Sequence, residues 1–263
     1  MSDRMLSGKV ALITGAAHGL GLAIASAMAR EGATLALFDM DWPTLEEVAG
    51  RMILDGRRVL PVKVDLRDVS EISDGIDRVV QELGRIDILV NNAGVIQIHD
   101  LEEVTLEEWD WIMGVNLRAV FAMSQAVGRV MLSQGGGAIV NIASIAGHTA
   151  FPDGSVYAVS KAAVRSLTEQ IAIAWAPRNI RCNAVSPGLG SWFMTGAGGD
   201  PDVKVRQAAR VPMRRTGDPD DFARVVVFLA SDSASYINGE TILVDGGLSR
   251  SLLTQLGVAE RPA

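Results

Sequence analysis

The sequence V-A-L-I-T-G-A-A-H-G-L-G, residues 10–21, joins an apolar run to a glycine-rich turn, and the helical pattern Leu22–Ala29 follows it directly. The apolar run is typical of a buried strand. Glycines at a strand-to-helix turn let the backbone approach a pyrophosphate, and the free N–H groups and dipole of the new helix favour its charge. The segment therefore predicts a nucleotide-binding strand-turn-helix unit.

The glycines of this turn, Gly15, Gly19 and Gly21, do not follow the spacing G-x-G-x-x-G, because Ile24 stands where the third glycine would be. A tight structural turn without a ligand is therefore the alternative interpretation. The order of strand, glycines and helix favours the phosphate site.

Apolar runs with strand character alternate with longer helical patterns along the whole chain. After Val10–Ile13, the candidate strands are Leu35–Phe38, Val59–Val64, Ile86–Val90, Ala138–Ala143, Arg181–Val185 and Thr241–Val244. Such alternation predicts an α/β fold with a doubly wound parallel sheet and helices on both faces. Ligands should bind beyond the carboxyl ends of the strands. Because no linker or internal repeat interrupts the pattern, residues 1–263 are expected to form a single domain.

The composition restricts the class of protein. The 263 residues carry a net charge of -7, which argues against nucleic acid or an anionic membrane as the main partner. The single cysteine, Cys182, excludes an intrachain disulfide and a multi-cysteine zinc site, and no metal is expected. The sequence has no signal pattern and no apolar run of the length needed to span a membrane. We expect a cytoplasmic protein.

Asp39 ends the second candidate strand and indicates the cofactor. A carboxylate there can accept hydrogen bonds from an adenosine ribose and repel the 2′-phosphate of NADP. Met40 and Asp41 follow it, so no basic residue offers a phosphate partner. The sequence therefore predicts NAD, the alternative being an uncommitted surface aspartate. Small polar groups also follow the third and fourth strands, at Asp65 and at N-N-A-G, residues 91–94.

Ser144, Tyr157 and Lys161 form the candidate catalytic group. Tyr157 and Lys161 are four residues apart, a spacing that places both side chains on one face of a helix. A lysine charge beside the phenol would lower the pKa of Tyr157 and make it an acid/base. Ser144 follows a buried strand, where its hydroxyl can hold a substrate oxygen. A chance match of this short spacing is the alternative.

Together these motifs resemble the short-chain dehydrogenase/reductase family over residues 5–248. The resemblance is carried by T-G-A-A-H-G-L-G (14–21), D-L (65–66), N-N-A-G (91–94), G-V-N-L (114–117), Ser144, Y-A-V-S-K (157–161), N-A-V-S-P-G (183–188) and V-D-G-G (244–247). It implies a Rossmann-like domain whose seven strands have the order 3-2-1-4-5-6-7.

The resemblance also implies the roles of individual residues. Ser144 would hold the substrate oxygen, Tyr157 would pass the proton, Lys161 would lower the tyrosine pKa and hold the nicotinamide ribose, and Asn116 would hold a water linked to Lys161. Cofactor contacts are expected from Gly15, His18, Gly19, Leu20, Gly21, Asp39, Asp65, Leu66, Asn92, Ala93, Gly94, Tyr157, Lys161, Pro187, Gly188 and Gly190.

A substrate lid is expected at about residues 189–216, where a glycine-rich and then basic segment follows a strand end. A solvated surface excursion is the alternative. Many relatives hold the nicotinamide amide with a threonine shortly after Pro-Gly, but this chain has Gly190 and Trp192, so either Thr195 or backbone alone takes that role. The expected substrate contacts are Ser144, His148, Trp192, Phe193 and Met194.

The expected function is NAD-dependent hydride transfer between nicotinamide and a small or medium secondary alcohol or ketone. One alternative is a reductase of 3-oxoacyl groups on an acyl-carrier protein. Another is a dinucleotide-binding sensor or scaffold without catalysis. The expected partners are the small-molecule substrate and copies of the same chain, because helical stretches around Glu107–Gln134 and Ser155–Ala176 are apolar on more than one face and relatives are commonly tetramers or dimers.

Overall fold

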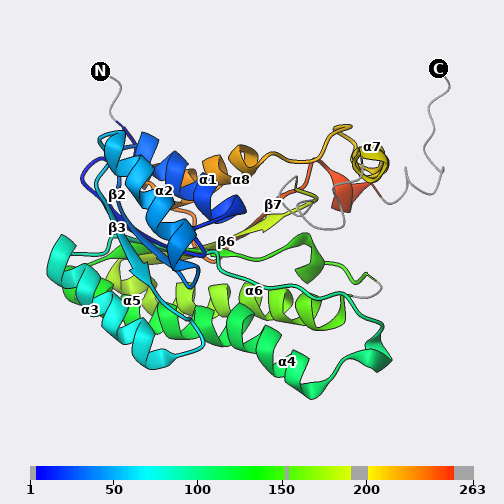
Figure 1. Ribbon diagram of the computed structural model, residues 1–263, viewed down its shortest axis with the longest axis horizontal. Helices are drawn as coiled ribbons and strands as arrows, with labels where there is room; N and C mark the ends of the chain where they lie inside the picture. The colour runs from blue at the N-terminus through cyan, green and yellow to red at the C-terminus, as the bar shows by residue number, and fades with distance from the viewer. Residues whose placement is uncertain (1–3, 152–153, 191–200, 252–263) are drawn as a thin grey trace.

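The computed structural model of the protein describes residues 4–151, 154–190 and 201–251. Within these ranges the sheet is seven-stranded, parallel throughout, and ordered β3-β2-β1-β4-β5-β6-β7 (Figure 1). The strands are β1 (Val10–Thr14), β2 (Thr34–Asp39), β3 (Val59–Lys63), β4 (Ile88–Asn91), β5 (Gly137–Ile142), β6 (Ile180–Pro187) and β7 (Thr241–Val244). The predicted fold class and strand order are confirmed.

Helices cover both faces of the sheet. They are α1 (Gly19–Arg30), α2 (Trp42–Leu54), α3 (Val69–Leu83), α4 (Leu106–Met113), α5 (Ala119–Gln134), α6 (Ser155–Trp175), α7 (Pro201–Arg210) and α8 (Pro219–Ala230). Figure 1 shows α1, α2 and α8 on one face and α3, α5 and α6 on the other. In the described part of the chain, no helix has the length and apolar character that a membrane crossing requires.

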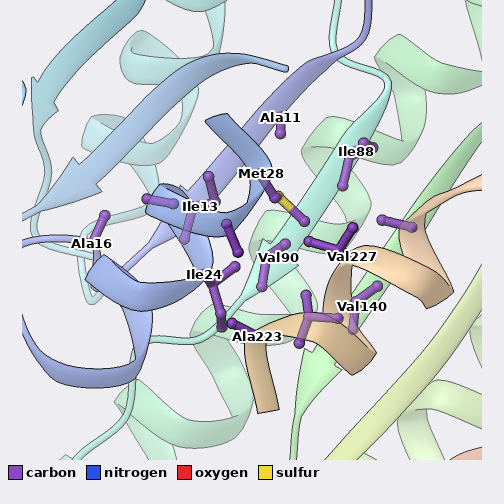
Figure 2. Close-up of a cluster of buried hydrophobic side chains, with 14 of the residues drawn as sticks. Ala11, Ile13, Ala16, Ile24, Met28, Ile88, Val90, Val140, Ala223 and Val227 are labelled. Carbon is purple, nitrogen blue, oxygen red and sulfur yellow. The ribbon is translucent and has the colours of Figure 1, made fainter. Parts of the chain in front are cut away.

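Alternating residues of the central strands supply the two cores. On β1, Ile13 faces the core shared with α1 and α8, whereas Leu12 faces the core shared with α3 and α5. Figure 2 shows Ile24 and Met28 of α1 beside residues of β4 and α8 in the first core. Because both faces are buried, the strands have continuous apolar sequences, which made them readable in the sequence.

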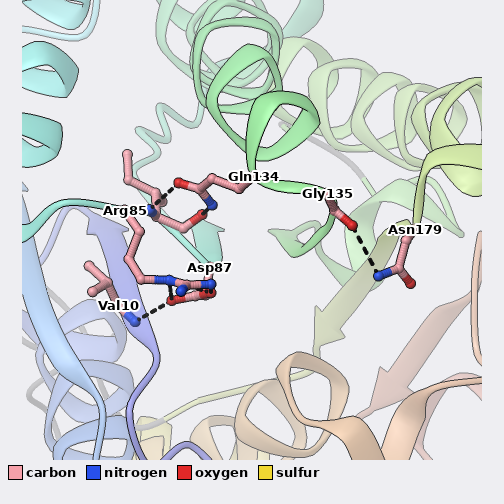
Figure 3. Close-up of polar contacts among 7 residues, drawn as sticks. Val10, Arg85, Asp87, Gln134, Gly135 and Asn179 are labelled. Carbon is pink, nitrogen blue, oxygen red and sulfur yellow. Dashed lines mark hydrogen bonds and ion pairs between the residues drawn. The ribbon is translucent and has the colours of Figure 1, made fainter.

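Polar contacts fix the amino edge of the sheet (Figure 3). The carboxylate of Asp87 accepts a hydrogen bond of 2.8 Å from the N–H of Val10 and bonds from Arg85. Gln134, at the end of α5, bonds both the N–H and the carbonyl of Ile86. These contacts tie the starts of β1 and β4 together, so the two strands end side by side at the opposite edge.

A π-helical turn, Gly114–Arg118, interrupts the helix expected over Glu107–Gln134. The N–H of Ala119 bonds the carbonyl of Gly114, five residues earlier, and the chain then continues as α5. Such turns insert one residue into the helical repeat and often occur at functional sites. Asn116 lies in the middle of this turn and is fully buried.

Candidate active site

A cleft of about 770 Å³ lies at the carboxyl edge of the sheet. It runs from the glycine turn after β1 and the end of β2 to Ser144, Tyr157 and Lys161. The predicted residues that line it are Gly15, His18, Gly19, Leu20, Gly21, Asp39, Asp65, Leu66, Asn92, Ala93, Gly94, Ser144, Tyr157, Lys161 and Pro187. The structure therefore brings most of the predicted site residues into one cleft.

The glycine turn before α1 is closely packed and needs residues without a Cβ. Gly15 has a positive φ of 65°, and a Cβ there would lie 2.9 Å from the Cα of Ala93. A Cβ on Gly21 would overlap the carbonyl oxygen of Gly15. In the described residues, no side chain caps the amino terminus of α1 and its first turn carries no acid. The turn thus presents backbone N–H groups at a positive helix end, as a pyrophosphate requires.

Thr14 braces this turn, and its role was not predicted. Its hydroxyl oxygen accepts hydrogen bonds from the N–H groups of Asn92 and Ala93, at 3.0 and 3.1 Å. The side chain of Asn92 in turn donates to the carbonyls of Thr14 and Gly15. The side chain of Asn92 therefore stabilises the conformation of the turn. The same hydrogen bonds join the ends of β1 and β4 where the cleft begins.

Two carboxylates and an imidazole lie at the end of β2. Asp39 accepts a hydrogen bond of 3.0 Å from the N–H of Ala17 through Oδ2, and another of 3.0 Å from the N–H of Asp41 through Oδ1. Nε2 of His18 is 2.8 Å from Oδ2 of Asp41. Asp39 lines the cleft and carries negative charge at the position expected for an adenosine ribose.

Arg67 is a cleft residue that the sequence did not reveal. Its Nε–H donates hydrogen bonds to both carboxylate oxygens of Asp65, at 3.0 Å to Oδ1 and 3.1 Å to Oδ2. This hydrogen-bonded ion pair lowers the pKa of Asp65. Because Asp65 is paired, its carboxylate adds less net negative charge to this end of the cleft than the sequence implied.

The catalytic candidates meet at the other end of the cleft. Ser144 begins a short 3₁₀ turn, Ile145–Gly147, after β5. Tyr157 and Lys161 lie on the first turns of α6 and are almost wholly buried, with 7% and 4% of their surface exposed. The ammonium of Lys161 is 5.8 Å from the centre of the Tyr157 ring. The predicted helical spacing therefore places both groups beside Ser144 in the same cleft.

Burial shifts the pKa values of both Tyr157 and Lys161. Burial raises the pKa of Tyr157 above its ordinary value, and a hydrogen bond with Ser144 opposes that shift. Burial also lowers the pKa of Lys161 to about 8. The lowering of the tyrosine pKa by Lys161 stays a prediction, and any such effect acts against the desolvation of the buried phenol.

Asn116 is not among the described residues that line the cleft, and its side chain instead bonds the backbone of Val95, after β4. Its Oδ1 accepts a bond of 2.8 Å from the N–H of Val95, and its Nδ2 donates to the Val95 carbonyl and to Oγ of Ser160. A Cβ placed on Gly94 would lie 3.3 Å from Nζ of Lys161 and 3.4 Å from Oδ1 of Asn116. Asn116 and Lys161 thus converge on Gly94, while the side chain of Asn116 is committed to fixing the segment after β4.

Several predicted residues lie elsewhere. His148 is not among the described residues that line the cleft, and Nε2 of its half-buried ring is 2.9 Å from Oγ of Ser186. Gly188 packs so closely that a Cβ would lie 2.6 Å from that of Asp245, which explains the glycine without a ligand. Gly190 forms a bridge with Gly217. The remaining predicted positions, Trp192, Phe193, Met194 and Thr195, lie outside the described residues.

Apolar side chains complete the cleft wall. The unpredicted lining residues of this kind are Met40, Val64, Val95, Ile96, Trp111, Val115, Ile142 and Ala143. Most of them neighbour a predicted position in the sequence, and that adjacency is the signal that could have found them. Val115 likewise precedes the predicted Asn116, whereas Trp111 on α4 neighbours no predicted position and had no such signal.

Comparison with known proteins agrees with this geometry. A family model described as enoyl-(acyl carrier protein) reductase matches residues 15–249. A D-threitol dehydrogenase of Mycolicibacterium smegmatis is 41% identical over 250 residues, covering 93% of this chain and 94% of the relative. A 3-oxoacyl-(acyl-carrier-protein) reductase of Thermotoga maritima is 41% identical over 245 residues, covering 92% and 98%.

A solved structure shares both fold and sequence. It is a gluconate 5-dehydrogenase from Burkholderia cenocepacia, in complex with NADP and tartrate, and superposes with a TM-score of 0.90 at 34% identity. The match covers 95% of this chain and 99% of that one. This chain therefore shares its fold with an enzyme that was solved in complex with NADP.

Proposed function

The chain belongs to the short-chain dehydrogenase/reductase family, and on that basis we propose that it moves a hydride between NAD(H) and a small or medium secondary alcohol or ketone. The predicted family and the predicted oxidoreductase activity on CH–OH groups are confirmed by these relatives. The observation that carries the proposal is one cleft with the glycine turn and Asp39 at one end and Ser144, Tyr157 and Lys161 at the other.

The residues at the glycine turn fit a dinucleotide. Its close-packed glycines and the uncapped start of α1 suit a pyrophosphate, and Asp39 suits an unmodified ribose. When bound, a nicotinamide dinucleotide supplies the hydride donor or acceptor. Everything else in the reaction is positioning, charge and proton transfer by the protein.

Ser144 and Tyr157 are the proposed hydrogen-bonding and proton-transfer partners of the substrate oxygen. In alcohol oxidation Tyr157 takes the hydroxyl proton while Ser144 donates a hydrogen bond to the same oxygen. In ketone reduction the proton returns by the reverse path. Lys161 supplies positive charge beside the phenol, which favours the phenolate in the step where Tyr157 must act as a base. The raised pKa of Tyr157 keeps the phenol protonated near neutral pH, which is the form that ketone reduction requires.

The preference for NAD over NADP rests on charge. Asp39 and Asp41 put carboxylates where a 2′-phosphate would add negative charge, and Met40 between them offers no compensation. The gluconate 5-dehydrogenase from Burkholderia cenocepacia, which is 34% identical, was solved in complex with NADP. That complex describes the cofactor of the relative and not of this chain. For this chain the proposed cofactor is NAD.

Two further features belong to the proposal. The substrate lid at about 189–216 stays a prediction, which is supported by the hydrogen bond of 2.9 Å that the N–H of Gly217 donates to the carbonyl of Leu189 at the ends of that segment. A homo-oligomer, dimer or tetramer, would cover apolar side chains exposed on α5 and α6. These are Phe121, Val159 and Ile173, with 50%, 46% and 79% of their surface exposed.

A panel of secondary alcohols, polyols, hydroxysteroids and the matching ketones tests the proposed function, with reduced-nicotinamide absorbance as the readout. We expect turnover of at least one secondary alcohol with NAD. Absence of turnover throughout the panel, with NADH bound, would favour a sensor or scaffold.

A second candidate is reduction of 3-oxoacyl groups on acyl-carrier protein, favoured by the 41% identity to the Thermotoga maritima reductase. The test compares a carrier-bound 3-oxoacyl chain with free ketones of similar length. Turnover of the carrier-bound chain alone would favour this second function. Turnover of free ketones favours the first.

A further inference from the structure

The short turn that carries Ser144, residues 144–147 and here called the serine turn, is bonded to β6 through the side chain of His148. His148 directly follows the turn, and Nε2 of its half-buried ring is 2.9 Å from Oγ of Ser186. Ser186 lies on β6 and is fully buried, and the next residue, Pro187, lines the cleft. This contact therefore joins the serine turn to the cleft end of β6.

We propose that His148 is a positioning residue for Ser144, whose ring accepts a hydrogen bond from Ser186 and so holds the serine turn in the geometry that the reaction needs. The inference rests on the proposed function, in which the Ser144 hydroxyl donates a hydrogen bond to the substrate oxygen. His148 acts through the turn, since it is not among the described residues that line the cleft. A misplacement of about 1 Å at a reacting group can cost about 10²-fold in rate, so a shifted turn should slow the reaction.

Two further contacts hold the serine turn, and both come from α6. Nη1 of Arg165 donates a hydrogen bond of 2.8 Å to the carbonyl oxygen of Gly147. A Cβ on Gly147 would lie 2.8 Å from the carbonyl oxygen of Lys161, so the turn packs directly on the backbone of the helix. Of these three contacts, the one between His148 and Ser186 reaches the sheet. Its loss would leave the turn held from the helix side.

The burial of Ser186 decides the direction of its hydrogen bond. Nε2 of His148 is the hydrogen-bond partner of the Ser186 hydroxyl within the described residues. Because a buried hydroxyl proton without an acceptor is destabilising, the hydroxyl donates and Nε2 accepts. An imidazole that accepts at Nε2 is neutral and carries its proton on Nδ1. The geometry therefore requires a neutral ring.

The surroundings of the ring favour this neutral form. Burial disfavours the imidazolium and is the largest cause that lowers the pKa of His148 below its ordinary value. Arg165 on α6 and Arg250, after β7, are cations that act in the same direction. Asp245, which also follows β7, opposes them. The ring therefore remains a hydrogen-bond acceptor at neutral pH, in agreement with the geometry.

His148→Leu and His148→Gln test the proposal as a matched pair, because leucine removes the acceptor and glutamine keeps one near the position of Nε2. We expect His148→Leu to lower kcat about tenfold or more and to leave the dissociation constant of NADH within about twofold. His148→Gln should restore most of kcat. Thermal unfolding shows whether each variant is folded.

Ser186→Ala removes the same hydrogen bond from the other side and carries the test if His148→Leu does not fold. It should lower kcat as much as His148→Leu does. The double variant should lose no more than either single variant, because both substitutions remove one shared interaction.

The pH profile separates positioning from packing. Protonation turns Nε2 into a donor and leaves the Ser186 hydroxyl proton without its acceptor, so wild-type kcat should fall as the pH drops through the pKa of His148, below the ordinary 6.5. Glutamine does not titrate in this range, so His148→Gln should lack this fall. His148→Leu should be slow at every pH.

Nitrogen NMR of ring-labelled histidine measures the bond without turnover, and His148→Gln assigns the signal. We expect the proton of His148 on Nδ1, and a change in the Nε2 shift in Ser186→Ala. A proton on Nε2 at neutral pH, or a kcat within twofold of wild type in folded His148→Leu or Ser186→Ala, would overturn the inference. A wild type that turns over no alcohol or ketone would instead overturn the proposed function, so the two failures are distinguishable.

Discussion

The ammonium of Lys161 points at the sheet, where Nζ donates a hydrogen bond of 2.8 Å to the carbonyl oxygen of Ile142 at the end of β5. Lys161 is 4% exposed, and burial lowers its pKa to about 8. A buried cation with one carbonyl partner costs stability, because water solvates an ammonium better. Lys161 therefore lowers the free energy of unfolding, as expected for a residue kept for function rather than stability.

Lys161→Met should therefore raise stability while removing activity. At pH 7 we expect the free energy of unfolding to rise by about 1–3 kcal/mol, since burial of an ammonium is replaced by burial of an apolar chain. The folded-state pKa lies below the ordinary 10.5, so wild-type stability rises with pH between about 8 and 10.5. Urea denaturation at pH 7 and pH 10 should show the advantage of the variant shrinking across that window. A variant less stable than wild type at both pH values would contradict this account.

Gly21→Ala should damage the phosphate turn. Its new Cβ would overlap the carbonyl oxygen of Gly15 and lie 2.6 Å from Nδ2 of Asn92, so the turn must shift. We expect a loss of about 1–3 kcal/mol in unfolding free energy and at least about tenfold weaker NADH binding. Fluorescence titration with NADH and urea denaturation measure the two effects.

Gly50→Ala is the matched control, because Gly50 lies inside α2 and its added Cβ would meet nothing within 4 Å. It should stabilise the protein by about 0.5–1 kcal/mol and leave NADH binding unchanged. Equal behaviour of the two variants would show that the packing of Gly21 does not matter to the cleft.

Cofactor choice gives a third prediction, centred on Asp39. Two like charges about 4 Å apart repel by about 1 kcal/mol in water and about 4 kcal/mol at an effective dielectric of 20, so NAD should be favoured roughly tenfold to a thousandfold. Asp39→Ala combined with Met40→Arg should move the preference toward NADP by removing the repulsion and adding a phosphate partner. The measurement is kcat/KM for both cofactors, and a wild type that uses them equally would argue against a ribose at Asp39.

The fold was largely predictable because its signals are local. Buried parallel strands leave continuous apolar runs, and each predicted strand lies within a few residues of an observed one, as Ile86–Val90 does for β4 (Ile88–Asn91). The order of the strands followed from the resemblance of scattered motifs to a known family, not from the runs themselves.

The sequence predicted most of the residues that the structure brings into the cleft, but not how deeply they are buried or which residues they contact. Spacing placed Tyr157 and Lys161 on one helix face, yet it carried no information on burial, which decides the direction of the tyrosine pKa. His148 follows Ser144 closely in sequence, but its ring turns toward Ser186 on β6, a contact between distant segments. Asp65 and Arg67 lie in the segment between β3 and α3, outside the regular elements, so no helical or strand periodicity predicted that their side chains pair.

The most direct test of the account is the turnover of Tyr157→Phe with NAD and a secondary alcohol that the wild type oxidises. Phenylalanine keeps the ring and its packing but removes the hydroxyl, so proton transfer should fail while cofactor binding persists. We predict a fall in kcat of at least about 10²-fold with NADH affinity little changed. Turnover within a few-fold of wild type would remove Tyr157 from the chemistry and contradict the proposed mechanism.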